Sequence, residues 1–313
     1  MKTYASYMFG THNVSGGADA ILGPSGCNKD VAKVDSGGMV YLDLEEHDER
    51  IAKVVALLQA AGKDISPSYW DEYTEEELQA APLLWLFRWH NAGMWTGPRY
   101  GVTYDVSQAC PRCLTGIRQA SPLIVDGSEM LTANKHRVSS ANYNNLLVRD
   151  TDVETLLAAN VTGVNFWPVT AKYNSGATGE IRWQQALIDN ILPPMSPSTR
   201  LVEEGKCLTC QRGRTSDNTH TPTRRVTYRR KDLQNICDFN LTWESFGPFD
   251  KYEQDTSGND VLMHPRTSSW ILVTPKVMNL LRGKTKKEQK YQGCGFAPIW
   301  IEDDTHDKPY LMT

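Results

Sequence analysis

Four of the seven cysteines stand in two short motifs of identical spacing. The segments are ACPRCLTG at 109–116 and KCLTCQRG at 206–213, and both have the form C-x-x-C-x-x-G. Two thiolates at this spacing point at one ion from a tight turn, and Zn²⁺ takes four such ligands in a tetrahedron. The motifs therefore predict one structural zinc ion held by Cys110, Cys113, Cys207 and Cys210.

The residues around the cysteines agree with this chemistry. Gly116 and Gly213 follow the two motifs, and glycine allows the positive φ that turns backbone amides toward thiolates. The 93 residues between the motifs (114–206) make an unusually long loop for a zinc ribbon. The cost of closing a loop grows only logarithmically with its length, and structural zinc contributes more than that cost. We therefore expect the ion to join two separate modules.

Two other interpretations of the cysteines stay open. A redox-active dithiol is one, although such a motif normally precedes a helix, and TGIRQASP at 115–122 is a poor helix start. Two buried, reduced pairs without metal are the other. An odd number of cysteines argues against a disulfide framework.

The elements that position the motifs look duplicated. Residues 145–170 and 270–301 share a short apolar strand, a helix with apolar residues at i, i+3 and i+4, a glycine turn and a strand ending in F-x-P. Each copy follows one C-x-x-C motif. We therefore predict two βαβ halves, about 105–200 and 201–301, within a domain of residues 105–313.

The first 104 residues predict a different, acidic α+β module. Residues 1–80 contain 14 acidic and 6 basic residues, whereas the whole chain of 313 residues has a net charge of only −4. A strand at 39–44 leads into a predicted helix at 45–61, and Thr74 with Glu77 forms a capping box for a second predicted helix at 75–92. We expect a surface for a basic partner within 43–49 and 71–77, formed by Glu45, Glu46, Asp48, Glu49, Glu75 and Glu76.

The second half carries a basic stretch between 212 and 231. Cationic side chains beside zinc-binding motifs can neutralise nucleic-acid phosphates. The candidate contacts are Arg224, Arg225, Arg229 and Arg230. The alternative interpretation is a solvated surface loop, because runs of charge usually lie on the surface.

Residues with catalytic potential are sparse. The seven histidines form no HExxH or related pattern, and we assign no catalytic residue. A thiol needs an adjacent base to act as a nucleophile, so a His12–Cys27 pair in the glycine-rich N-terminal region is the one enzymatic alternative.

Hydropathy predicts a protein that neither crosses nor enters a membrane. The longest apolar stretch, APLLWLF near residues 81–87, is far shorter than the ~18 residues that a membrane span needs. The first residues lack the apolar segment of a secretory signal. We therefore expect a cytoplasmic location.

From about residue 99 to 301 the chain resembles the bacterial double-CxxCG proteins, described chiefly from myxobacteria. The residues that carry the resemblance are CPRC at 110–113, CLTC at 207–210, LPPMSPST at 192–199, TWESFG at 242–247, and the segments FWPV and FAPI. Leu114 and Gln211 stand where the family has a glycine directly after the second cysteine. The resemblance implies zinc binding and, as in some family members, immunity to a cognate toxin.

These observations predict an α+β fold: an acidic N-terminal module followed by a duplicated βαβ domain held by a Cys₄ zinc site. The predicted function is that of a non-enzymatic binding protein with a protein partner, such as an immunity protein that neutralises a bacterial toxin. The alternatives are a nucleic-acid-binding zinc protein of a defence or regulatory system, and an enzyme with its site in the glycine-rich N-terminus.

Overall fold

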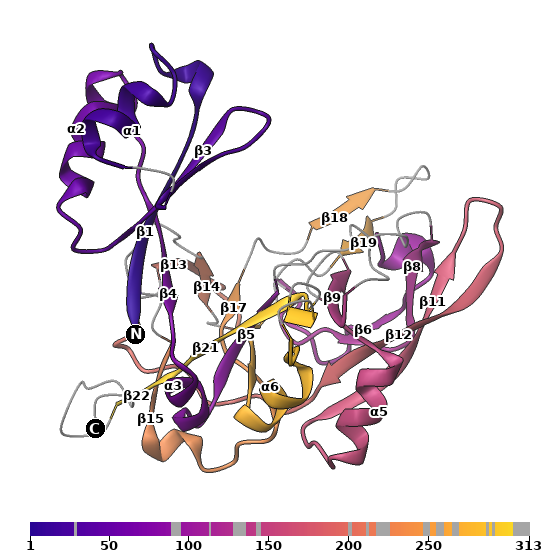
Figure 1. Cartoon of the computed structure of the whole chain (residues 1–313). Helices are drawn as coiled ribbons and strands as arrows, with labels where there is room; N and C mark the ends of the chain where they lie inside the picture. The colour runs from indigo at the N-terminus through magenta and orange to yellow at the C-terminus, as the bar shows by residue number, and fades with distance from the viewer. Residues whose placement is uncertain are drawn as a thin grey trace. The chain divides into compact units, whose positions relative to one another are not determined.

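The structure is a computed structural model with a mixed α+β fold, and its chain divides into two compact units (Figure 1). The first unit is Met1–Glu77 and the second begins at Leu78. The residues that the structure describes are 1–27, 30–88, 95–112, 114–127, 136–141, 145–199, 202–210, 213–216, 226–246, 251–254, 260–264, 269–285, 288–289 and 292–302.

The first unit is built on a four-stranded antiparallel sheet of order β2-β3-β1-β4. Its strands are β1 (Lys2–Gly10), β2 (Ala32–Val34), β3 (Met39–Glu45) and β4 (Ser68–Glu72). Successive side chains of a strand point to opposite faces, so Ala5, Tyr7 and Phe9 of β1 face the core and are at most 3% exposed.

Two helices, α1 (Asp19–Ser25) and α2 (Arg50–Ala60), cover that core face (Figure 1). Val54 and Leu58 lie one turn apart on α2 and are buried with the apolar side chains of β1 and β3. The helix begins five residues later than the sequence predicted, because Glu45 pairs with Tyr4 as the last residue of β3. A short 3-10 helix, η1 (Thr11–Asn13), follows β1.

The second unit contains two larger sheets. The first has the order β8-β11-β12-β10-β9. Its strands, with helix α5, are β8 (Leu123–Asp126), β9 (Val138–Ala141), β10 (Asn145–Arg149), α5 (Asp150–Ala158), β11 (Val164–Lys172) and β12 (Thr178–Ile188). Buried apolar side chains of this sheet, including Leu123, Leu147 and Trp183, form one core cluster.

The other large sheet has the order β16-β20-β5-β21. Its elements are β5 (Leu84–Arg88), β16 (Phe239–Leu241), β20 (Ile271–Val273), α6 (Pro275–Leu281) and β21 (Cys294–Pro298). A parallel pair, β15 (Thr227–Arg229) with β22 (Trp300–Glu302), continues it, because β22 follows β21 after one residue.

Strand β5 overturns the predicted helix at 75–92. The capping box of Thr74 and Glu77 is present, with Glu77 N–H donating to Thr74 Oγ1 at 3.3 Å, but the helix it starts, α3 (Glu75–Ala80), has only six residues. Pro82 has no N–H to continue a helix, and the apolar run after it is buried as a central strand beside β20 and β21 (Figure 1). For the same reason the second unit begins before residue 80, earlier than the boundary expected near residue 104.

Each large sheet contains a strand–helix–strand segment, and a third strand separates the two strands of that segment. In the first, β12 lies antiparallel between β10 and β11. In the second, β5 lies antiparallel between β20 and β21. The two segments are therefore split βαβ units rather than directly paired ones.

The registers of the two sheets are the same. One row of the first sheet runs Val138, Val148, Gln184 and Pro168. The corresponding row of the second runs Phe239, Val273, Leu84 and Pro298. The parallel outer strands also match, with Ala171 opposite Val125 and Ile301 opposite Tyr228.

The remaining elements of the second unit are short. They are η2 (Pro98–Tyr100), β6 (Tyr104–Asp105), β7 (Arg118–Gln119), β13 (Val202–Lys206), β14 (Gly213–Ser216), η4 (Arg230–Leu233), β17 (Ser245–Phe246), β18 (Lys251–Gln254) and β19 (Asp260–His264). Four of them, β6, β7, β13 and β14, flank the cysteine motifs.

Candidate metal centre

Each cysteine motif lies in the loop of an antiparallel hairpin. The first motif connects β6 with β7, where Tyr104 pairs with Gln119. The second connects β13 with β14, where Lys206 pairs with Gly213. A hairpin loop carrying C-x-x-C is the unit from which zinc ribbons are built, so local structure agrees with the sequence prediction at both places.

Backbone hydrogen bonds shape the first loop. The Leu114 N–H donates to the Cys110 carbonyl oxygen and the Cys110 N–H donates to the Thr115 carbonyl oxygen, both at 2.9 Å. Leu114 has φ +57° and Gly116 has φ +97°. Leu114, which stands where the resembling family has glycine, thus adopts the backbone conformation that favours glycine. The positive φ predicted for Gly116 is confirmed.

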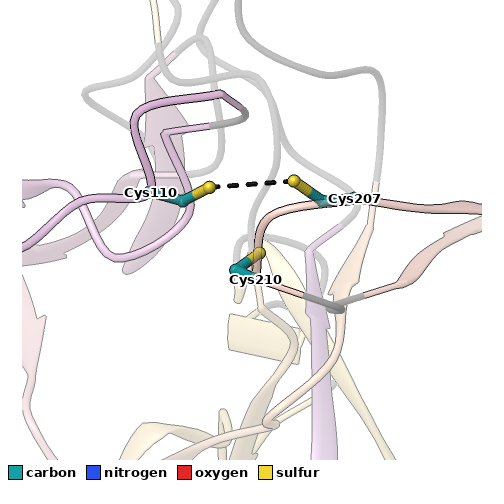
Figure 2. A group of neighbouring side chains, drawn as sticks. All are labelled: Cys110, Cys207 and Cys210. Atoms are coloured by element: carbon teal, nitrogen blue, oxygen red, sulfur yellow. Dashed lines mark hydrogen bonds between the residues drawn. The ribbon is translucent and has the colours of Figure 1, made fainter.

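Three cysteine sulfurs from the two hairpins converge (Figure 2). The Sγ atoms of Cys110 and Cys207 are 3.7 Å apart, and the Sγ atoms of Cys110, Cys207 and Cys210 all lie within 4.8 Å of one another. A tetrahedron with Zn–S bonds of about 2.3 Å has edges of about 3.8 Å. A disulfide would require a separation of about 2 Å, and no disulfide joins any two of these three cysteines. The spacing therefore suits a shared metal ion.

Burial adds to the case for an ion at this place. Cys110 is 8% exposed and Cys207 is 4% exposed. Several thiols gathered out of water would repel one another once ionised, and a divalent cation removes that cost. These cysteines are the one group of three or more potential metal ligands that the described part of the chain brings together.

The fourth predicted ligand, Cys113, lies outside the described residues. The structure thus brings together three of the four predicted ligands. Among the described residues, each motif is followed by a strand and not by a helix, so the helix N-terminus that lowers the pKa of a redox-active cysteine is missing there.

The predicted acidic partner surface is divided among different environments. Glu45 ends β3 and forms an ion pair with Lys2 at 2.7 Å. Hydrogen bonds from Arg50 lower the pKa of Asp48 to about 2 and neutralise its charge locally. Of the others, Glu46 follows the end of β3, Glu49 precedes α2, and Glu75 and Glu76 lie in the first turn of α3.

The structure describes only some of the other candidate residues. Arg224 and Arg225 lie outside the described residues, while Arg229 ends β15 and Arg230 begins η4. His12 is exposed in η1, whereas Cys27 is 6% exposed in the core of the first unit. Within the described residues no hydrogen bond joins His12 to Cys27.

Comparison with known proteins found no match for this chain, either among protein-family models or among curated proteins. Among the helices of the described residues, none has both the length and the apolar character of a membrane span. The assignment of function therefore rests on the chemistry of the residues themselves.

Proposed function

We propose that the protein is a non-enzymatic binding protein whose second unit is held together by one structural Zn²⁺. The observation that carries this proposal is the convergence of the Cys110, Cys207 and Cys210 sulfurs from two hairpins. Cys113 would complete the tetrahedron. An ion held by four protein ligands has no open position for water or substrate, so it supplies stability and not catalysis.

The second unit is proposed to be a tandem duplication, which explains the distance between the cysteine motifs. Each half would contain, in order, a middle strand, a C-x-x-C hairpin, three strands, a helix and a last strand. The matched registers favour halves of about 83–172 and 183–302, whereas the sequence alone predicted about 105–200 and 201–301. Cys110 and Cys207 occupy equivalent positions in the two proposed halves. A metal ion on the axis that relates the halves would require these two residues to lie close together.

The middle strands are exchanged between the proposed halves. β5 precedes the first cysteine motif but lies in the sheet of the second half, and β12 precedes the second motif but lies in the sheet of the first. Strand exchange of this kind is typical of domain-swapped dimers. In a fused, strand-exchanged dimer of this kind, the proposed metal between the halves has a structural role and no catalytic one.

The resemblance to double-CxxCG proteins extends the proposal to immunity against a cognate toxin. That part of the proposal rests on the resemblance alone. The acidic first unit suits a basic partner, because complementary charge steers association and selects partners. A cytoplasmic location fits the reduced cysteines that zinc binding needs.

The zinc proposal is tested by metal analysis of protein purified without chelators. We expect about one zinc per chain, lost in Cys207→Ser and Cys113→Ser. Removing zinc with a chelator should expose the amide hydrogens of β6, β7, β13 and β14 to exchange, while those of β1 and β3 stay protected.

Cys237→Ser is the matched control, because Cys237 is a free cysteine outside the sulfur cluster. It should keep its zinc. A Cys207→Ser protein with full stability and one bound zinc would refute the proposal, as would wild-type protein without any transition metal.

A further inference from the structure

One face of the sheet in the first unit is not covered by α1 and α2. Side chains at even positions of β1 point away from the core, and their neighbours on β3 and β4 do the same. The outward rows are Glu45–Tyr4–Trp70, Asp43–Ser6–Ser68 and Lys33–Tyr41–Met8.

This face carries large apolar side chains in two rows, on either side of the polar row Asp43–Ser6–Ser68. Met8 is 57% exposed, Trp70 is 44% exposed and Tyr41 is 40% exposed. The rings of Tyr4 and Trp70 stack with centroids 4.4 Å apart and an interplanar angle of 11°. Single exposed apolar residues are ordinary, but two neighbouring pairs of them on one sheet face, Tyr4 with Trp70 and Met8 with Tyr41, favour a binding site. Trp and Tyr are also enriched in the energetic centres of interfaces.

Each aromatic ring of the face donates a hydrogen bond to a carboxylate. Tyr4 Oη donates to Glu72 at 3.2 Å, and Trp70 Nε1 donates to Asp43 at 3.4 Å. Tyr41 Oη donates to Asp35 at 3.3 Å. Three aromatic–carboxylate pairs therefore lie on one sheet face.

Such pairs match the guanidinium group. Arginine stacks its planar group on an aromatic ring and donates paired hydrogen bonds to a carboxylate. A lysine ammonium is a compact, strongly hydrated charge and gains less from the same pair. The pattern selects arginine among the cationic side chains.

Charge favours a cationic occupant of this face. Its carboxylates belong to Asp35, Asp43, Glu45 and Glu72, and its cations to Lys2 and Lys33, so its formal charge is −2. Nucleic-acid phosphates would be repelled, and the same face of a second copy would bring the same sign of charge.

We propose that this face, formed by Tyr4, Met8, Tyr41 and Trp70 with their carboxylate partners, docks an arginine-rich segment of a partner protein. The inference rests on the proposed binding function and specifies its partner. It places the docking site on the sheet, not on the helix starts that carry Glu49 and Glu76.

The test uses the full-length, zinc-loaded protein and two fluorescein-labelled peptides, nona-arginine and nona-lysine, in fluorescence anisotropy. We expect nona-arginine to bind at least fivefold more tightly than nona-lysine. Tyr41→Ala with Trp70→Ala should weaken nona-arginine binding at least tenfold, and Asp43→Asn with Glu45→Gln should do the same. Circular dichroism checks that each variant is folded.

The matched control is Glu49→Gln with Glu76→Gln, which removes the same charge away from the face and should change the Kd less than twofold. Equal losses in the two charge variants would overturn the proposal in favour of general electrostatic attraction. Tight binding of an oligothymidine, or a dimer that Trp70→Ala dissociates, would overturn it in favour of nucleic acid or a second copy. Because zinc content is measured separately, failure here leaves the zinc proposal standing.

Discussion

At the scale of single residues, Leu114 shows how the first cysteine loop departs from a glycine-based one. Its φ of +57° costs a leucine about 1–2 kcal/mol relative to the right-handed region. Its side chain is only 5% exposed, and burying a leucine contributes about 1.5–3 kcal/mol. Burial of the side chain therefore offsets the strain of the backbone.

This balance predicts an unusual order of stability for two variants. Leu114→Ala loses the buried side chain and keeps the strain, whereas Leu114→Gly loses the side chain and relieves the strain. We expect the glycine variant to be the more stable of the two by about 1 kcal/mol in denaturant unfolding.

Leu156 is the control for this comparison, because it is fully buried in helix α5. There the order should be reversed, since glycine costs about 1 kcal/mol relative to alanine inside a helix. If alanine were the better substitute at both positions, the left-handed conformation of Leu114 would have no energetic consequence.

Glu244 is a partly buried acid, and one of its two carboxylate oxygens accepts a hydrogen bond. Its Oε1 accepts the Met195 N–H at 2.7 Å, while Oε2 and the nearby Tyr228 Oη have no hydrogen-bond partner among the described residues. Burial raises the pKa of Glu244, and the Met195 N–H only partly opposes that effect. The raised pKa means that the folded state binds this proton more readily than the unfolded state does.

Stability should therefore fall as pH rises from the unfolded pKa, near 4.3, through the raised folded pKa. Glu244→Gln removes the buried charge and keeps an oxygen for Met195. We expect it to raise the Tm at pH 8 and to leave the Tm unchanged at pH 4. The exposed Glu154→Gln should have no effect at either pH, and an equal gain for Glu244→Gln at both pH values would contradict the electrostatic cause.

At the scale of elements, equivalent loops of the two proposed halves make reciprocal contacts. Phe239 N–H donates to the Thr162 carbonyl oxygen, and Val138 N–H donates to the Gln292 carbonyl oxygen, both at 3.0 Å. In each case the loop after one helix meets the first strand residue of the other sheet. The next residue of each loop is a glycine with positive φ, Gly163 or Gly293.

Ion pairs at the same junctions have opposite polarity. Arg137, just before β9, pairs with Asp152 of α5 and also donates to the Leu280 and Arg282 carbonyl oxygens at the end of α6. Asp238, just before β16, pairs with Lys276 of α6 at 3.0 Å. The residue before β9 or β16 thus pairs with a first-turn residue of the same sheet's helix, with the charges exchanged.

The glycines give a direct test of this junction. A Cβ at Gly163 would overlap the Phe239 carbonyl oxygen, and one at Gly293 would overlap the Val138 carbonyl oxygen. Backbone strain and overpacking together should make Gly163→Ala and Gly293→Ala cost about 3 kcal/mol or more each in the free energy of unfolding.

Gly176 in the β11–β12 turn supplies the control. It has φ +82° but open space around a Cβ, so Gly176→Ala should cost only the strain, about 1 kcal/mol. An equal loss of stability in all three variants would mean that the close approach of the two sheets adds no steric cost at Gly163 and Gly293.

At the scale of the whole molecule, charge and metal chemistry belong to different units. The acidic residues concentrate in the first 77 positions, and the converging cysteines belong to the second unit. One unit thus carries the proposed docking face, and the other carries the proposed zinc ion. Separate experiments can therefore address them.

The sequence alone determined the α+β class, the two cysteine motifs and the repeated strand–helix–strand pattern, because these depend on local spacing. It did not determine that residues 84–88 form a strand, since a short apolar run suits a buried helix or a buried strand equally well. Only the tertiary structure decided that β5 lies between β20 and β21, which are distant from it in sequence, and that β12 separates β10 from β11. It also decided that Cys110 meets Cys207 across 97 positions and that Tyr4, Tyr41 and Trp70 share one open face. Those contacts follow from pairing between distant segments, which leaves no periodic trace in the chain.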